Sequence, residues 1–350
     1  MQIERRTFLA GTAAACALWT TRGFAQADAT KAYFDQLHAA AKAEGEVTWY
    51  IAHWGTDLAQ KVAGAFEQAW PGVKVNVVRA TSQVIYQRLT QDMKAQVANC
   101  DVFGSADNGQ YVTLKADKKL MAFEAKNLAG CAPVLRDYDP SRLTTITDAN
   151  PTVLAYNTNL VKAADAPKKW TDLLDPKWMG QVAVPHPGFS GAMGAFCVAM
   201  TKLYGWEFFE KLHKNKPHVA RSLVDPPVTI GSGERKVGLS TAATAIGMKE
   251  RGQPITPVFP EDGAMLNVGP TSIMANAKHP NAAKLFLEFL LSKPAGDFTA
   301  SEFLVPVRSD VTPVAGVPAL GALKGIKSDP IEIAEKLPDL IEKWRDTFGV

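Results

Sequence analysis

Residues 46–57 read EVTWYIAHWGTD. The first part is mostly apolar, β-branched or aromatic, which predicts a buried strand, and HWGTD predicts a loop after it. The order then repeats: residues 73–78 (VKVNVV) predict a strand, residues 80–98 a helix with Ser82 as a plausible cap, and residues 100–104 (CDVFG) a third strand. Strands that alternate with helices predict parallel pairing through right-handed crossovers.

The same pattern restarts further along the chain. Residues 150–161 (NPTVLAYNTNLV) and 181–185 (QVAVP) predict strands, and a helix is expected from about 191 to 204. Residues 267–277 (NVGPTSIMANA) predict a strand pair that returns to the first unit. We therefore expect an α/β protein of two lobes, joined by crossings near residues 150 and 260, with a cleft where the carboxyl ends of the strands meet.

These crossings give the predicted domain limits. Residues 1–27 form an export signal, residues 28–150 with 260–305 an N-terminal lobe, and residues 151–259 with 306–350 a C-terminal lobe. Roughly 320 residues after the signal is more than one hydrophobic core usually serves.

The N-terminal stretch MQIERRTFLAGTAAACALW predicts export rather than a membrane anchor. Arg5 and Arg6 precede a short apolar run, and small residues up to Ala27 follow. ERRTFLAG is similar to a twin-arginine signal, although an ordinary signal with two adjacent arginines is the alternative. A lipid anchor at Cys16 is a further alternative, but AAAC lacks the large aliphatic residue usual there. We expect a periplasmic protein.

Charge gives little reason to expect a nucleic-acid or membrane partner. Removing residues 1–27 takes away three arginines and one glutamate, which leaves 35 basic against 34 acidic residues and a net charge of +1. Three cysteines follow the signal. Cys100 and Cys131 would pair in an oxidising compartment or stay as two thiols, and Cys197 is expected to be buried. The cysteine and histidine spacings support no structural zinc site, and we expect no cofactor.

The loop after the QVAVP strand, HPGFSGAMGAF (residues 186–196), carries the most informative motif. Ser190 lies between Gly188 and Gly191, one glycine short of the nucleophile elbow G-x-S-x-G, because Ala192 replaces the second glycine. A serine at a helix start, with free backbone N–H groups beside it, favours an anion. Three interpretations stay open: an anion ligand held with Gly191 and Ala192, a simple cap, or a nucleophile.

Two loops of the first unit are expected to face the same cleft. In HWGTD, His53, Trp54, Gly55 and Thr56 offer a ring nitrogen, a stacking surface and hydrogen-bond donors. In GSADNG, after the third strand, Ser105 is a candidate ligand. The alternatives are a tryptophan that packs on its own lobe and a turn with a capping serine.

These segments, in this order, resemble the periplasmic solute-binding proteins of ABC importers, in particular the group that includes the ferric-iron binders. EGEVTWYIA, CDVFGSADNGQ, WTDLLDPKWMGQVAVPHPGFSG and KHPNAAKLFLEFLLS carry the resemblance over the whole chain after the signal. It implies a type II-like two-lobed fold that closes by hinge motion on a small molecule and delivers it to an ABC permease, acting as a monomer.

One departure from that family bears on the ligand. Iron-binding members have two adjacent tyrosines where this chain has Ala243 and Thr244, so direct ferric binding is not expected. The resemblance then implies a small organic solute such as a phosphonate, a phosphorylated sugar or a carboxylate, with a polyamine or a ferric complex as the alternatives. The serine–glycine helix start favours an anion, with Thr241 as a further ligand. Asp57, Asp107 and the pair Glu261 and Asp262 are the carboxylates available for a cation.

A secreted serine hydrolase that uses Ser190 is the alternative from a different class. It needs a histidine base and a carboxylate beside the serine. His186 is close in sequence, and folding would have to bring His53 across the cleft. We expect a binding protein and not an enzyme.

Overall fold

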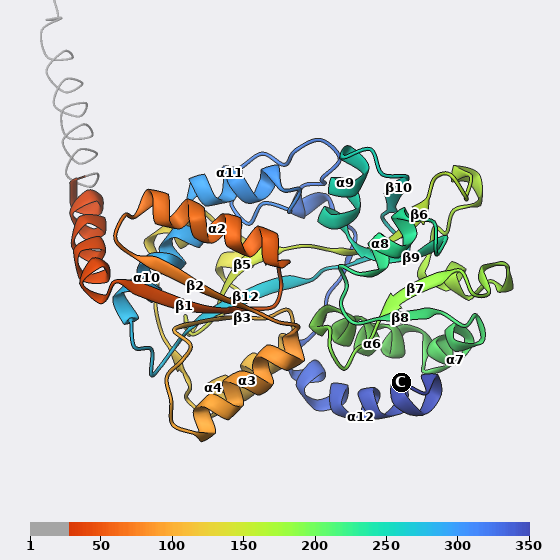
Figure 1. Ribbon diagram of the computed structural model, residues 1–350, viewed down its shortest axis with the longest axis horizontal. Coiled ribbons are helices and arrows are strands. Elements are labelled where there is room, and N and C mark those ends of the chain that lie inside the picture. The colour runs from red at the N-terminus through yellow and green to blue at the C-terminus, as the bar shows by residue number, and fades with distance from the viewer. Residues whose placement is uncertain (1–27) are drawn as a thin grey trace, which may run out of the picture.

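The computed structural model describes residues 28–350, and the predicted export signal lies outside this range. In the described part of the chain the named strands form two sheets, which lie side by side along the long axis of the molecule in Figure 1. Each sheet and the helices packed on it make one lobe, so the predicted two-lobed α/β fold is confirmed.

The first lobe is built on a mixed sheet in the order β2-β1-β3-β12-β4, with β5 also paired to β12. Its strands are β1 (Glu46–Ile51), β2 (Lys74–Arg79), β3 (Val102–Gly104), β4 (Leu120–Met121), β5 (Thr145–Ala149) and β12 (Val268–Met274). β1 pairs in parallel with β2 and β3, as the alternating pattern predicts. The predicted strand pair in residues 267–277 is wrong: β12 is one strand, antiparallel to β3, β4 and β5.

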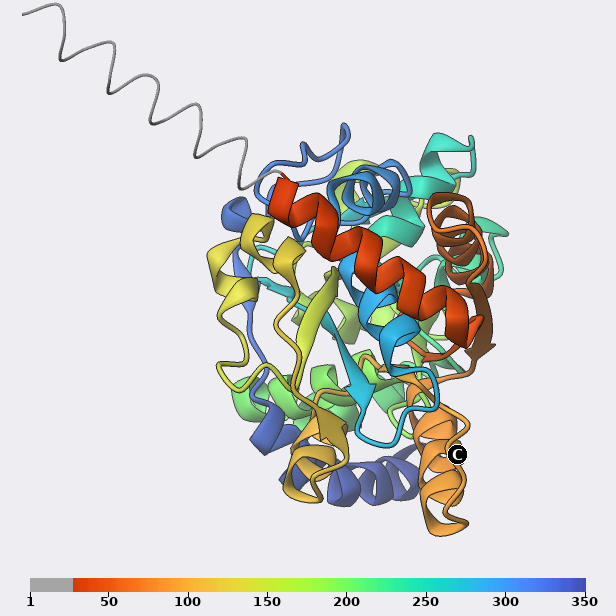
Figure 2. The same cartoon turned by 90° about the vertical axis from the view of Figure 1, so that its left-hand side faces the viewer.

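Helices cover both faces of this sheet. They are α2 (Thr56–Ala69), α3 (Ser82–Lys94), α4 (Gly109–Ala116), α5 (Pro133–Arg136), α10 (Pro280–Leu290), α11 (Lys293–Ser301) and the 3₁₀ turn η1 (Lys126–Gly130). Trp49 packs with Phe66 and Phe286 on one face, and its neighbour Tyr50 packs with Ile85 on the other. Adjacent strand residues point to opposite faces, so β1 reads as a continuous apolar run. Figure 2 shows the helical residues 28–44 lying across the outside of α10.

The second lobe is built on the sheet β13-β11-β6-β9-β7-β8, with β10 also paired to β6. Its strands are β6 (Thr152–Asn157), β7 (Val182–Pro185), β8 (His218–Ala220), β9 (Val237–Thr241), β10 (Ile255–Val258), β11 (Ala264–Met265) and β13 (Gly325–Ile326). Its helices are α6 (Gly191–Tyr204), α7 (Glu207–Lys214), α8 (Pro226–Gly231), α9 (Ala242–Glu250) and α12 (Pro330–Phe348), with 3₁₀ turns η2 (Ala163–Asp165), η3 (Trp170–Leu174), η4 (Pro176–Trp178) and η5 (Leu320–Ala322).

Two crossings between the lobes run side by side. The chain passes from β5 to β6 through Asn150, and from β11 to β12 through Asn267. The backbone N–H of Asn150 donates to the Asn267 carbonyl at 3.0 Å, and the Asn267 amide donates to Thr152 Oγ1 at 2.5 Å. β11 belongs to the second sheet, so this crossing lies at residues 266–267 rather than at 260.

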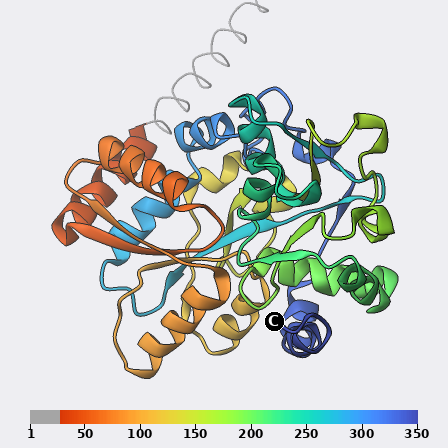
Figure 3. The ribbon, with the colours of Figure 1, turned by 45° about the vertical axis from the view of Figure 1, so that its right-hand side comes forward.

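A third connection leaves the first lobe after the predicted limit at residue 305. Ala132 N–H donates to the Val307 carbonyl, and Ser309 N–H donates to the carbonyl of Gly130. The chain then reaches β13 and α12, which packs against α6 and α7 of the second lobe and also against α4 of the first. Figure 3 shows α12 at the edge of the second lobe, beside the first. These contacts support moving the proposed limit towards residue 311.

The two lobes touch closely at two glycines. A Cβ on Gly191, at the start of α6, would stand 2.7 Å from Asp107 Cβ and 2.8 Å from the carbonyl carbon of Ala106. A Cβ on Gly109 would stand 2.8 Å from the backbone nitrogen of Ala334 in α12. Both spacings are shorter than real Cβ contacts. This contact between the lobes therefore requires glycine, which has no side chain, at both positions.

The cysteines remain separate. Cys100 lies in the core beneath α3 and α4, whereas Cys131 lies in the core beneath α2 and α10. Cys100, Cys131 and Cys197 are buried free thiols, so the Cys100–Cys131 pairing is wrong and the alternative of two thiols holds. Burial raises the pKa of all three.

A glycine in the second sheet gives a test of this architecture. Gly238 in β9 lies against β7, where an added Cβ would overlap the Ala183 carbonyl oxygen. Gly238→Ala is expected to lower the free energy of unfolding by about 1–3 kcal/mol through overpacking. Gly64→Ala is the matched control, because its Cβ meets nothing within 4 Å and alanine favours the helix α2. Urea unfolding measures both, and equal effects would contradict this packing.

Candidate functional site

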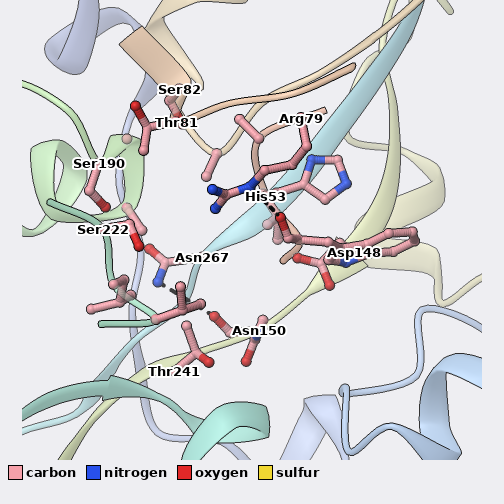
Figure 4. A pocket seen from close by; sticks show the side chains of 18 residues that line it. His53, Arg79, Thr81, Ser82, Asp148, Asn150, Ser190, Ser222, Thr241 and Asn267 are labelled. Carbon is pink, nitrogen blue, oxygen red and sulfur yellow. Dashed lines mark hydrogen bonds between the residues drawn. The ribbon is translucent and has the colours of Figure 1, made fainter. Parts of the chain in front are cut away.

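A cavity lies between the lobes, where the carboxyl ends of strands from both sheets meet (Figure 4). The space that a water centre can reach inside it is about 50 Å³, room for roughly three to five waters. Its polar lining comes from both lobes and from the crossings: His53, Trp54, Arg79, Thr81, Ser82 and Asp148 from the first lobe, Asn150 and Asn267 from the crossings, and Ser190, Ser222 and Thr241 from the second. We call it the interlobe cavity.

Three helices begin at the interlobe cavity. α3 begins after Thr81, α6 after Ser190 and α9 after Thr241, each cap residue following a strand or its loop. Ser190 Oγ accepts from Met193 N–H at 3.3 Å, and Thr241 Oγ1 accepts from Thr244 N–H at 3.2 Å. Free N–H groups and the positive end of the helix dipole make each terminus favourable for an anion.

The cap of α3 differs from the prediction. Ser82 is the first helical residue, and Thr81 is the N-cap without a side-chain cap bond. Thr81 is 8% exposed, and its Oγ1 has no hydrogen-bond partner within residues 28–350. A buried hydroxyl that does not cap its own helix is available to a ligand in the cavity.

Arg79 supplies the positive charge. It is the last residue of β2, and its Nε donates to the Trp54 carbonyl at 3.1 Å, which holds the side chain over the interlobe cavity. Burial lowers the pKa of the guanidinium, and Asp225 nearby opposes that change. A guanidinium stays protonated in proteins, and in residues 28–350 this one forms no ion pair. Figure 4 shows it directed towards Ser190 and Ser222.

His53 and Asp148 flank the same glycine. A Cβ on Gly269 would stand 2.7 Å from Asp148 Cβ and 2.9 Å from His53 Cδ2. Burial lowers the pKa of His53 to about 3, so its ring is neutral. Burial raises the pKa of Asp148 to about 7, although the Trp54 indole N–H and the Ala149 backbone N–H oppose that rise.

Unpaired buried atoms are concentrated in this cavity. Both ring nitrogens of His53, Trp54 Nε1, Asp148 Oδ1 and Thr81 Oγ1 have no hydrogen-bond partner of good geometry among the described residues. Leaving a buried polar atom unpaired costs about 1–3 kcal/mol, so native structures keep few of them. Several in one cavity indicate groups that a bound solute would satisfy.

The structure brings together six of the nine predicted ligand residues. His53, Trp54, Ser190, Gly191, Ala192 and Thr241 line the interlobe cavity. Trp54 also packs edge-on against Trp49 at 5.6 Å between ring centroids, so it is part of the core of its own lobe. Whether these side chains hold a solute remains a prediction.

Gly55, Thr56 and Ser105 do not line the interlobe cavity. Gly55 precedes α2 and accepts the Ala59 N–H, and Thr56 is exposed at the start of that helix, where the chain turns away. Ser105 is fully buried, and its Oγ accepts the Asp107 N–H within its own loop. The Ser105 loop therefore forms the structural turn that was the alternative interpretation.

Besides Ser82, which was predicted as a cap, six polar residues of the cavity were not predicted as ligands: Arg79, Thr81, Asp148, Asn150, Ser222 and Asn267. Arg79 ends the strand VKVNVVR, and that position after a parallel strand was a usable signal. Asp148 is the penultimate residue of β5, a strand that the sequence pattern did not indicate. Asn150 and Asn267 lie 117 positions apart and meet only because the crossings pair. No local sequence motif predicts such a pair.

Ser190 does not have the surroundings of a nucleophile. The His186 Nδ1 accepts the Gly188 N–H at 2.8 Å, and its Nε2 lies 3.1 Å from the Val350 carbonyl oxygen. His53 lines the same cavity, but its ring nitrogens have no partner. Within the described residues no histidine is hydrogen-bonded to the Ser190 hydroxyl, so the geometry offers it no base.

The carboxylates considered for a cation are scattered. Asp57 is exposed, Asp107 accepts from Gly109, Gln110 and Gln83 inside the first lobe, and Asp262 accepts from Trp170 and Tyr204 in the second. In residues 28–350 no three histidine, cysteine or acidic side chains are placed to hold a metal ion. Thr244, at a position where the resemblance implies a tyrosine in iron binders, forms a hydrogen bond with Thr241.

Comparison with known proteins identifies the family. The model of the bacterial extracellular solute-binding protein family matches residues 101–324, and the chain belongs to that family. Binding proteins of this kind bind small molecules and deliver them to ABC permeases. Among residues 28–350, no helix is both long and apolar enough to cross a bilayer.

Particular relatives match most of the chain in sequence or in fold. A candidate 2-aminoethylphosphonate-binding periplasmic protein of Salmonella typhimurium is 26% identical over 344 residues, 94% of each chain. The periplasmic binding protein AfuA of Actinobacillus pleuropneumoniae, solved with fructose-6-phosphate, aligns with a TM-score of 0.79 at 24% identity, over 87% of this chain and 99% of AfuA. Iron-bound HitA of Pseudomonas aeruginosa aligns with a TM-score of 0.74 at 21% identity, over 86% and 99%.

The opposed pKa shifts of His53 and Asp148 predict opposed effects of pH on stability. The folded state keeps a proton on Asp148 that the unfolded chain releases above about pH 4. The free energy of unfolding therefore falls as pH rises from 4 to about 7. His53 has the reverse effect. Below about pH 6.5 the unfolded chain binds a proton on His53, whereas the folded ring stays neutral down to about pH 3, so the free energy of unfolding rises with pH over this range.

Urea unfolding from pH 4 to 8 separates the two groups. Relative to the unchanged protein, Asp148→Asn is expected to gain stability as pH rises through 4–7, and His53→Gln to lose it as pH rises towards 6.5. Asp57→Asn, at an exposed site, is the control and should show no such trend. Curves that stay parallel for all three variants would show that neither group is shielded as described.

Proposed function

We propose that this protein is a periplasmic, monomeric receptor that captures a small organic anion between its lobes and delivers it to an ABC permease. Its phosphonate, phosphate or carboxylate head would lie at Arg79, Thr81, Ser190 and Thr241. The observation that carries the proposal is one unpaired guanidinium together with three helix N-termini at a single cavity. Charge-assisted hydrogen bonds of this type are the strong ones.

Charge also weighs against the other ligands of the family. A polyamine needs several facing carboxylates, and Asp148 is the one acidic residue that lines the interlobe cavity within the described chain. A ferric ion needs anionic oxygen ligands, and the positions of the tyrosine pair hold Ala243 and Thr244. The small volume supports a short solute over a bulky chelate.

Thermal unfolding in the presence of a ligand panel tests the anion site, since a ligand that binds only the folded state raises Tm. The panel contains ethylphosphonate, 2-aminoethylphosphonate, glycerol 3-phosphate, succinate, putrescine and ferric citrate. We expect organic anions to raise Tm and putrescine and ferric citrate not to. Ser190→Ala should weaken anion binding by about ten- to a hundredfold, because a hydrogen bond to a charged group contributes about 1.5–3 kcal/mol.

Arg79→Gln should weaken the same anions at least as much, and the loss should shrink at high salt. Arg251→Gln, at an exposed arginine, is the matched control and should bind like the unchanged protein. Calorimetric titration measures the affinities. Unchanged affinity in both cavity variants would move the anion site elsewhere, and covalent labelling of Ser190 by a fluorophosphonate would favour the hydrolase.

Closure on the solute gives a separate test. The paired crossings at Asn150 and Asn267 are the proposed hinge. A bound anion that bridges Arg79 and Ser190 holds the lobes together, so ligand should reduce the radius of gyration in small-angle scattering. Gly191→Val should abolish the reduction, since its side chain would meet the backbone at Asp107. Equal compaction of Gly191→Val and the unchanged protein would contradict the closed geometry.

A further inference from the structure

We propose that the solute carries a primary ammonium group as well as its anionic head, and that Asp148 binds this ammonium. The proposal rests on the anion site proposed above and divides the interlobe cavity into two ends. Arg79 and the helix N-termini form the anionic end. Asp148 and His53, which both lie against Gly269, form the cationic end.

Position separates the two ends. Asp148 lies at the end of β5, two residues before the crossing at Asn150, and it lines the cavity. In Figure 4 the Arg79 guanidinium extends towards Ser190 and Ser222, whereas the Asp148 carboxyl lies on the other side of the Arg79 side chain, beside His53. The two charged groups form no ion pair with each other, so each is free for a different part of one solute.

Asp148 is also buried without a charged partner among the described residues. The residue is 4% exposed, its Oδ1 has no donor, and within residues 28–350 no cationic side chain pairs with it. A carboxylate in that position would repel a purely anionic solute, and a buried unpaired charge is costly. An ammonium group brings three donors and no acceptor. It therefore matches Asp148 Oδ1 and the one acceptor nitrogen of the neutral His53 ring, which is also unpartnered.

The competing interpretation is a protonated Asp148 that donates a hydrogen bond to the anionic head. The two interpretations predict different ligand preferences. If Asp148 is a protonated donor, an amino group elsewhere in the solute should not raise the affinity. Under our proposal, a solute with both groups should bind far better than a solute with the anionic head alone. The small cavity volume limits the two groups to a short chain between them.

Calorimetric titration with matched ligand pairs tests the proposal. The pairs are 2-aminoethylphosphonate against ethylphosphonate and 3-aminopropylphosphonate against propylphosphonate, at pH 7.5. In at least one pair the amino compound should bind at least tenfold more tightly to the unchanged protein. Asp148→Asn should erase this preference, leaving both members of the pair within about threefold of one another. Asp57→Asn should retain the preference. If Asp148→Asn does not fold, Asp148→Ser removes the same charge in a smaller side chain.

Each failure has a distinct signature. Equal binding of both members of each pair by the unchanged protein, or a preference for the compound without nitrogen, overturns the ammonium site. A preference that survives in Asp148→Asn also overturns it. The anion site itself fails in another way: no phosphonate binds, or Arg79→Gln binds ethylphosphonate or propylphosphonate as the unchanged protein does. Tight binding of putrescine that is independent of Arg79 would point to a cation receptor and contradict both proposals.

Discussion

A parallel strand places the start of the following helix at the edge of the sheet where the strand ends, and the site of this protein depends on that constraint. β2 leads to α3, β7 to α6 and β9 to α9, so Thr81, Ser190 and Thr241 all reach the edges that face one another. None of the three helices needs a special sequence to attract an anion, because the free N–H groups belong to the backbone. What is particular to this chain is the choice of side chains around those termini.

The parts of the site that follow from local sequence could be predicted. A buried strand that runs into Pro-Gly-Phe-Ser-Gly predicts both the helix α6 and a cap at Ser190, and the structure has both. His53 follows the first strand and also lies where the pattern indicates. Thr81 and Ser82 show the limit of this reasoning. Either residue type is a suitable N-cap, and the backbone geometry decides which of the two caps the helix.

Other features depend on contacts between distant segments and were missed for that reason. Asp148 has an unusual chemical setting only because it is buried beside His53 and Gly269, which come from two other strand ends. Asn150 and Asn267 become a paired crossing through the return of β12 to the first sheet, which the sequence indicated as two strands. Likewise, α12 contacts both lobes, and its amphipathic sequence does not say which surfaces it covers.

In the lobe closure that we propose, the unpaired atoms of the cavity would couple solute binding to that movement. With the lobes closed, His53, Thr81 and Asp148 are shielded from water, and the described residues supply their free atoms with no partners. Opening the cleft would return water to these groups, so the unpaired atoms disfavour the closed form when no solute is bound. A solute that satisfies them removes that cost in the closed form alone, which is the differential affinity that a conformational shift requires. Asp148 and His53 remain uncharged near pH 6 without solute. A solute with the ammonium group we propose would stabilise the carboxylate, and binding would then release a proton.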